Sequence, residues 1–144
     1  MPPPGRYGDR AAQAPADGTG IRVFVVEDEA AIALDLGERL TALGYAVCGT
    51  AARGETAVRQ IAELRPDIVL MDIKLAGSMD GVEVAHQLHE HYDVPVVYLS
   101  AFADAQLIAR ATKTNCYGYL VKPFDERELH ATLTVALKRF QASD

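Results

Sequence analysis

The stretch from Arg22 to Glu29 reads RVFVVEDE, an unbroken apolar run that ends in three acidic residues. A continuous apolar run, rather than an alternating one, is typical of a parallel strand that is buried on both faces. Further runs of this kind follow along the chain, at Tyr45–Ala51, Ile68–Met71, Val94–Leu99 and Tyr117–Val121. The sequence therefore predicts five short parallel strands, with the acidic residues placed where the first strand ends.

Helical spacing fills the gaps between these runs. The first stripe ends before Gly44, a residue that favours a helix end, and the second ends before Pro66. The fifth begins with Asp125 and Glu128, which together resemble a capping box. The five stripes are Ile32, Leu36, Leu40 and Leu43; Ala57, Ile61 and Leu64; Val84, Ala85 and Leu88; Leu107, Ile108 and Ala111; and Leu129, Leu133, Leu137 and Phe140. Strict alternation of strands and helices predicts an α/β fold: a doubly wound, five-stranded parallel sheet with helices on both faces.

Composition limits the class of protein. The 144 residues suffice for one domain, and 49% of them are hydrophobic. The net charge of −6 argues against a nucleic-acid partner, which calls for clustered Lys and Arg. The apolar runs are too short for membrane insertion, and no signal-peptide core is present, so we expect a cytoplasmic protein. In a reducing compartment Cys48 and Cys116 are expected to be free, buried thiols.

The first 20 residues differ from the rest of the chain. They are rich in Pro and Gly and hold almost no large apolar side chains. Such a segment cannot bury enough surface to offset the entropy lost on ordering. We therefore predict a flexible N-terminal tail over residues 1–20 and one folded domain over residues 21–144.

Chemically active side chains gather at the predicted strand ends. Glu27, Asp28 and Glu29 follow the first strand, whereas the later strands end in Asp72, Ser100 and Lys122. In such sheets ligands bind at the carboxyl ends of the strands. Clustered carboxylates repel one another, and a hard divalent cation such as Mg²⁺ relieves that repulsion. A merely solvated acidic rim is the alternative, but the agreement of several strand ends favours a site.

Four blocks carry a resemblance to a known family. They read VFVVEDE at 23–29, IVLMDIK at 68–74, PVVYLSA at 95–101 and GYLVKPF at 118–124. In this order and spacing they resemble the receiver domains of bacterial two-component response regulators, and the resemblance extends over residues 21–141. It implies a flavodoxin-like (βα)5 fold with strand order 2-1-3-4-5. It also implies a phosphoacceptor signalling protein rather than an enzyme, apart from self-catalysed phosphorylation and dephosphorylation of an aspartate.

The resemblance assigns roles at the acidic rim. Asp72 matches the phosphoacceptor, and Glu27 and Asp28 match the acidic pair that binds Mg²⁺ together with Asp72. The main-chain carbonyl of Lys74 matches a further metal ligand. The loop that follows, IKLAGSMDG at 73–81, lacks the family's proline and is one residue longer than usual.

Three further residues match the family's switch machinery. Ser100 matches the switch hydroxyl, Tyr119 the switch aromatic, and Lys122 the lysine that contacts the phosphoryl group. The peptide bond between Lys122 and Pro123 matches one that is usually cis. On phosphorylation, Ser100 moves toward the phosphoryl group and Tyr119 turns inward. The surface of the fourth helix, the fifth strand and the fifth helix then changes and signals to a protein partner.

The resemblance further implies partners. The phosphodonor is a sensor histidine kinase or a phosphotransfer protein, the downstream target is an unknown protein, and a homodimer remains open. No room remains within these residues for a DNA-binding output domain after the fifth helix, so we expect a single-domain response regulator. Lys74 and Phe102 stand two residues after the phosphoacceptor and the switch hydroxyl. Neither can orient a hydrolytic water, which predicts a long-lived phosphorylated state.

Rival functions fit the residues less well. A phosphatase of the haloacid-dehalogenase type needs an acid two residues after its nucleophile, where this chain has Lys74. A receiver that only scaffolds would not need Asp28, Asp72, Ser100 and Lys122 together. A flavodoxin-like cofactor carrier would be repelled by the acidic EDEAA loop. The histidines His86, His89 and His91 are expected to form a polar helix face rather than a metal site.

Overall fold

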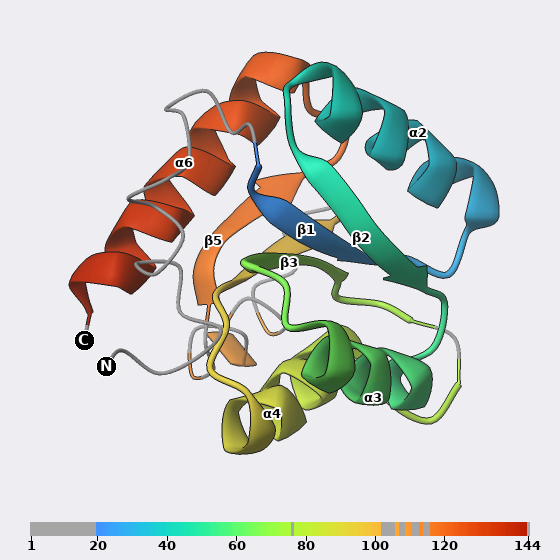
Figure 1. Ribbon diagram of the computed structural model, residues 1–144. Coiled ribbons are helices and arrows are strands. Elements are labelled where there is room, and N and C mark those ends of the chain that lie inside the picture. Colours follow the sequence, from blue (N-terminus) through green and yellow to red (C-terminus); the bar gives the residue numbers. More distant parts are fainter. Residues whose placement is uncertain are drawn as a thin grey trace.

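The computed structural model describes residues 20–75, 77–101, 106, 109–110, 113 and 116–143. Strands and helices alternate along this part of the chain (Figure 1). The strands are β1 (Arg22–Val26), β2 (Ala46–Ala51), β3 (Ile68–Asp72), β4 (Val96–Ser100) and β5 (Cys116–Val121). The helices are α2 (Ala30–Ala42), α3 (Gly54–Leu64), α4 (Gly81–His91) and α6 (Glu126–Ala142).

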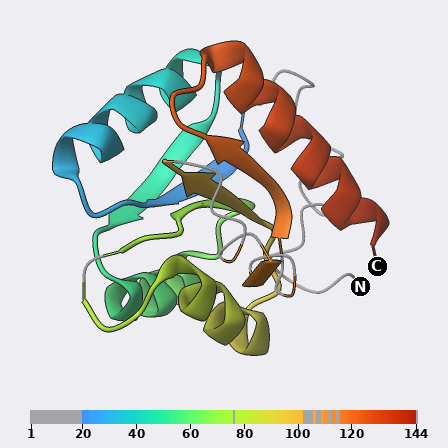
Figure 2. The same ribbon diagram turned by 180° about the vertical axis from the view of Figure 1, so that it is seen from behind.

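The strands form one sheet in the order β2-β1-β3-β4-β5, and every neighbouring pair is parallel. Helices α2 and α6 cover one face of this sheet, and α3 and α4 cover the other (Figures 1 and 2). This confirms the predicted doubly wound fold and its strand order. The carboxyl ends of β1 and β3 lie side by side, because Val26 pairs with Met71.

The central strands explain the continuous apolar runs. Within β1, Phe24 and Val26 pack with the core under α3 and α4, whereas Val23 and Val25 pack with the core under α2 and α6. All four side chains are fully buried. A strand covered by helices on both faces has no solvent-facing side, so it carries apolar residues at every position.

The strands and helices begin and end within a few residues of the predicted positions. The second strand begins at Ala46 rather than Tyr45, and the fourth begins at Val96 rather than Val94. Gly44 has φ +97° just after α2, a backbone conformation that suits glycine. Asp125 forms the predicted capping box with Glu128, in which each side chain accepts the other residue's backbone N–H.

Two predictions fall largely outside the described residues. These are the tail at 1–20, described only at Gly20, and the fourth helical stripe, of which Leu107, Ile108 and Ala111 are not described. Gln106, Ala109 and Arg110 in that stretch are helical. Cys48 and Cys116 are free but only partly buried, which corrects the expectation of full burial. No helix in the part of the chain that the structure describes is long and apolar enough to span a membrane.

Candidate functional site

Three carboxylates meet at the carboxyl ends of β1 and β3. Glu27 and Asp28 directly follow β1, and Asp72 is the last residue of β3. Because these strands are parallel neighbours, the three side chains converge, and one carboxylate oxygen of each lies within 4.8 Å of the others. The convergence that the sequence predicted at this rim is therefore present in the structure.

Lys122 brings a positive charge to the same place. Its Nζ lies 3.1 Å from Glu27 Oε1 and 3.5 Å from Asp72 Oδ2. The residue follows β5, and its backbone N–H donates to the Ser100 carbonyl at 2.7 Å, which ties it to the end of β4. The Lys122–Pro123 bond is cis, as predicted.

Burial sharpens the electrostatics of this cluster. Glu27 is 3% exposed and Asp72 is 8% exposed. Desolvation, together with the nearby charge of Glu27, raises the pKa of Asp72 to about 7. Desolvation also opposes ionisation of Glu27, but hydrogen bonds from the Glu29 N–H and from Lys122 outweigh it and lower the pKa of Glu27. The ionised form of Asp72 is therefore destabilised, and it lies beside the ionised carboxylate of Glu27.

The same contacts act on Lys122. Desolvation alone would lower the pKa of Lys122, but the hydrogen bond to Glu27 and the charges of Asp72 and Glu27 raise it above its usual value. Lys122 is therefore a permanent cation near neutral pH, held within reach of Asp72.

The loop after β3 is packed tightly against the site. The backbone N–H of Lys74 donates to Asp72 Oδ1 at 3.0 Å, and the N–H of Gly81 donates to the Ile73 carbonyl at 2.7 Å. A Cβ on Gly81 would lie 2.2 Å from the Asp72 carbonyl oxygen. Only glycine fits there, a role that the sequence reasoning missed. The Asp-Gly pair at the start of α4 was the available signal.

The two predicted switch residues lie on neighbouring strands. Ser100 ends β4 and is 6% exposed, whereas Tyr119 of β5 is 49% exposed. Tyr119 pairs with Tyr98, two residues before Ser100. The aromatic side chain therefore faces solvent in this structure and lies on the strand next to the hydroxyl. Phe102 lies outside the described residues.

The chemistry of the donor set fits a hard divalent cation. Glu27, Asp28 and Asp72 offer oxygen ligands alone, which suits Mg²⁺ rather than a metal that prefers nitrogen or sulfur. Among the described residues they are the one group of three such ligands close enough to hold an ion. The histidines of α4 lie exposed on its outer side, where His86 contacts Glu90 at 3.9 Å. This agrees with the predicted polar face.

Comparison with known proteins agrees with this geometry. The family model described as the response regulator receiver domain matches residues 23–134. The chain belongs to the response regulator receiver family. As a receiver domain it is part of the two-component class of signalling proteins.

Individual relatives extend the match. The chain is 40% identical over 121 residues to the transcriptional regulatory protein PdtaR of Mycobacterium tuberculosis, a match that covers 83% of this chain and 58% of PdtaR. The chain thus spans less than two thirds of that relative's length. The signal receiver domain of a modulated diguanylate cyclase from Desulfovibrio desulfuricans superimposes with a TM-score of 0.80 at 37% identity, covering 85% of this chain and 98% of that one.

One solved structure is informative about the acidic rim. It is the receiver domain of the sensor histidine kinase PA1611 from Pseudomonas aeruginosa, with a magnesium ion coordinated in its active-site cleft. It is 28% identical with a TM-score of 0.75, covering 83% of this chain and 99% of that one. The fold that surrounds the acidic cluster is therefore shared with a receiver known to hold magnesium.

Proposed function

We propose that this receiver accepts a phosphoryl group onto Asp72 in a Mg²⁺-dependent reaction. The observation that carries the proposal is the convergence of Asp72 with Glu27, Asp28 and Lys122 at one end of the sheet. A nucleophilic carboxylate, an oxygen-only ligand set and a fixed cation are what phosphoryl transfer to aspartate requires.

The reaction balances without any further group on the protein. A carboxylate oxygen of Asp72 attacks the phosphorus of a phosphohistidine on the donor protein. The new O–P bond forms as the P–N bond breaks, and the imidazole nitrogen keeps the electron pair and takes a proton from solvent. The protein acts as acceptor and self-catalyst rather than as an enzyme that turns over substrate.

Each residue has a defined task in this step. Glu27, Asp28 and Asp72 would hold Mg²⁺, with the carbonyl of Lys74 as a further proposed ligand. When bound, the ion supplies positive charge that offsets repulsion between the carboxylate and the phosphoryl oxygens. Lys122, already 3.5 Å from Asp72, supplies a second positive charge. Positioning and charge are the main contributions that this chemistry needs.

The signal follows from the same atoms. The phosphoryl group would draw the Ser100 hydroxyl toward it, and Tyr119, exposed in this structure, would turn inward. The surface formed by β5, α6 and the helical stretch before β5 would then present a different shape to a protein target. This is a local charge event acting on an element with two arrangements. The donor is a sensor histidine kinase or a phosphotransfer protein.

Intact-mass measurement with acetyl phosphate and Mg²⁺ tests the acceptor. The wild-type chain should gain one phosphoryl group, and Asp72→Asn should gain none. Asp35→Asn is the matched control, because Asp35 lies on α2 with its side chain 58% exposed. Full labelling of Asp72→Asn would refute the assignment. Phosphotransfer from each purified kinase of the host would then identify the donor.

A Lys122 variant separates labelling from signalling. Lys122→Ala should still be labelled to some extent, because Asp72 and the acidic pair remain. It should not show the amide chemical-shift changes across β5 and α6 that accompany labelling of the wild type. Full wild-type shifts in Lys122→Ala would show that the lysine has no part in the switch.

A further inference from the structure

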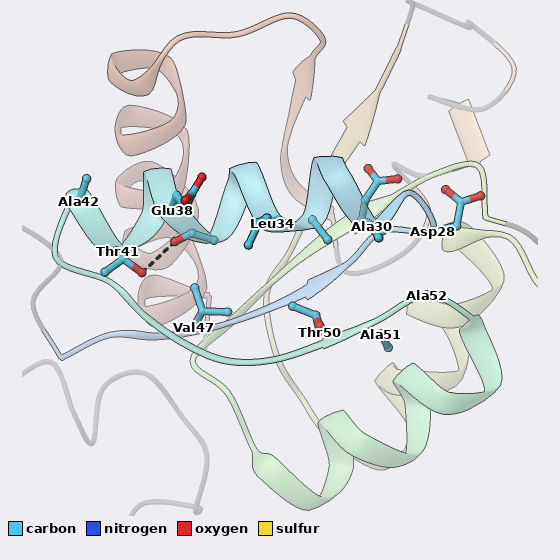
Figure 3. A pocket seen from close by; sticks show the side chains of 13 residues that line it. Asp28, Ala30, Leu34, Glu38, Thr41, Ala42, Val47, Thr50, Ala51 and Ala52 are labelled. Atoms are coloured by element: carbon cyan, nitrogen blue, oxygen red, sulfur yellow. Dashed lines mark hydrogen bonds between the residues drawn. The ribbon is translucent and has the colours of Figure 1, made fainter.

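An apolar groove runs along α2 on the side that faces the edge strand β2 (Figure 3). Its volume is about 810 Å³. Leu34 lies on the α2 wall, Val47 and Thr50 lie opposite on β2, and Asp28 lies at one end. Leu34 is 67% exposed, the highest value among the large exposed hydrophobic side chains of the described residues. No side chain of the described residues fills this apolar surface at the edge of the sheet.

Helix α2 carries apolar or small residues on two sides. Leu36 and Leu40 pack into the core beneath the helix and are almost fully buried. Leu34, Gly37 and Thr41 are spaced three and four residues apart, so they share a second side, and all three line the groove. A surface helix that only covers a core needs one apolar side, with polar residues on the other.

Gly37 marks where another backbone can come close. A glycine inside a helix costs about 1 kcal/mol relative to alanine. A Cβ at Gly37 would meet no heavy atom within 4 Å, so nothing in the described structure requires glycine there. Small residues on a helix allow the backbone of a second helix to approach. The part of the groove beside Gly37 and Thr41 leaves space for the backbone of a second helix.

The shape of β2 favours a helix over an added strand. The pairing of β1 with β2 shifts register between Val23 and Phe24, which leaves Cys48 unmatched in the ladder. A bulge of this kind on an edge strand opposes pairing with a further strand. The groove is instead walled by side chains from a helix and a strand, the arrangement that receives an amphipathic helix.

The charges around the groove define the partner. Among the described residues, its lining contains the acidic residues Glu27, Asp28 and Glu38 and no Lys or Arg. Glu27 is buried and paired with Lys122, and Asp28 belongs to the proposed metal site, so Glu38 is the acidic side chain that a partner can reach. Asp28 stands at the start of the groove, and Glu38 lies on α2 toward the other end (Figure 3). We propose that this groove binds an amphipathic helix of a partner protein, with apolar side chains against Leu34 and Val47 and basic residues toward Glu38. This proposal does not depend on phosphorylation of Asp72.

A peptide titration tests the proposal on the full ¹⁵N-labelled chain. The probe is a synthetic helix of about four turns with leucines at helical spacing and lysines beside them. Two control peptides keep its design but scramble the order or replace the lysines by glutamates. The probe should shift the amide signals of α2 and β2, and both control peptides should bind at least about tenfold more weakly.

Two variants and one control variant test where the peptide binds. A Cβ at Gly37 meets no heavy atom within 4 Å, so Gly37→Leu should place its side chain in the groove. We expect it to weaken the probe at least about tenfold while the melting temperature stays level or rises. Ala31→Leu, on an exposed position of α2 outside the groove lining, is the matched control and should bind as wild type. Glu38→Lys should weaken the lysine peptide and strengthen the glutamate peptide.

Several results would overturn the proposal. They are signal shifts confined to other surfaces, equal affinity for the scrambled peptide, or unchanged binding by Gly37→Leu. A dimer seen by sedimentation velocity, and dissociated by Gly37→Leu, would show that a second copy of this chain occupies the groove. Because acetyl phosphate labelling of Asp72 is measured separately, loss of either result leaves the other interpretable.

Discussion

Two buried aspartates lie at the two ends of β3, and the groups that contact them differ. Asp67 stands directly before the strand and is 1% exposed, whereas Asp72 ends it and is 8% exposed. At the first end, Asp67 Oδ2 accepts the backbone N–H of Arg22 at 2.8 Å. At the second end, Asp72 faces the carboxylate of Glu27 and the ammonium of Lys122. The Asp67 side chain links β1 to the start of β3 by a hydrogen bond, whereas the ionised form of Asp72 is destabilised by burial and by the charge of Glu27.

The residues around Asp67 also form structural contacts. Around Asp67, the Tyr92 hydroxyl donates to the Pro66 carbonyl at 2.7 Å, and the Arg65 guanidinium lies over the Tyr92 ring at 5.4 Å. The Arg22 side chain donates to the Leu64 and Arg65 carbonyls. These contacts join the start of β1 to the segment that leads into β3. Burial alone therefore does not distinguish Asp72 from Asp67, whereas the charges that surround each carboxylate do.

The largest expected effect comes from Gly81, which packs against the Asp72 end of β3. Gly81→Ala places a Cβ 2.2 Å from the Asp72 carbonyl oxygen, so the backbone must shift. We expect a loss of about 3 kcal/mol or more in the free energy of unfolding, measured by urea denaturation. Gly37→Ala is the matched control and should gain about 0.5–1 kcal/mol. Equal effects at the two glycines would contradict the close packing of this end.

Removing each aspartate comes next in size. Asp67→Ala leaves the Arg22 N–H without its acceptor and should cost about 1–3 kcal/mol in the free energy of unfolding. Asp67→Asn should cost less, because its amide oxygen can still accept. Asp72→Ala should cost less than Asp67→Ala, because it relieves repulsion from Glu27. A larger loss at Asp72 than at Asp67 would reverse the assigned roles.

Acidity distinguishes the Asp72 end further. In metal-free protein the pKa of Asp72 is raised from 3.8 to about 7, so the folded state binds the proton more tightly than the unfolded state. Stability is therefore lost as the pH rises between these values, and the loss is complete above the folded pKa. Asp72→Asn should raise the melting temperature by several degrees at pH 8, in the presence of chelator, and by much less near pH 4. A rise in melting temperature that does not depend on pH would show that the carboxylate of Asp72 is not destabilised in the folded state. Asp35→Asn is the control.

The sequence predicted the fold well because its signals are local. Continuous runs such as Ile68–Met71 mark strands buried on both faces, and Asp125 with Glu128 marks a helix start. The convergence of Glu27, Asp28 and Asp72 was predictable because parallel strands bring their last residues to one edge of the sheet. The fit of Gly81 and the groove beside Gly37 were not predictable, since both depend on distances between elements. The roles assigned to Ser100 and Tyr119 remain predictions.

Magnesium should produce a smaller thermal effect at the same rim. A ligand that binds only the folded state at ten times its Kd adds about 1.4 kcal/mol to the free energy of unfolding. This predicts a rise of a few degrees in melting temperature for the wild type in Mg²⁺ relative to chelator. Asp28→Asn should abolish most of the rise, because one of the three grouped carboxylates is lost. Asp35→Asn should keep it, and an unchanged rise in Asp28→Asn would exclude that residue from the metal site.

The smallest expected effect concerns how long a phosphoryl group stays on Asp72. Hydrolysis needs a water in line with the O–P bond, and Lys74, next to Asp72 through its N–H contact at 3.0 Å, has no carboxylate or carboxamide to orient one. Its ammonium can instead contact a phosphoryl oxygen, and a contact made in the ground state slows reaction unless it strengthens in the transition state.

We therefore predict a lifetime of minutes or longer for the phosphoryl group on wild-type Asp72 after donor removal. Lys74→Asn should shorten it a few-fold, and adding Phe102→Ala, the second residue that the sequence placed beside this path, should shorten it further. Asp35→Asn, with its side chain 58% exposed on α2, serves as the control. A wild-type lifetime of seconds, or no acceleration in the double variant, would show that these two side chains do not protect the phosphoryl group.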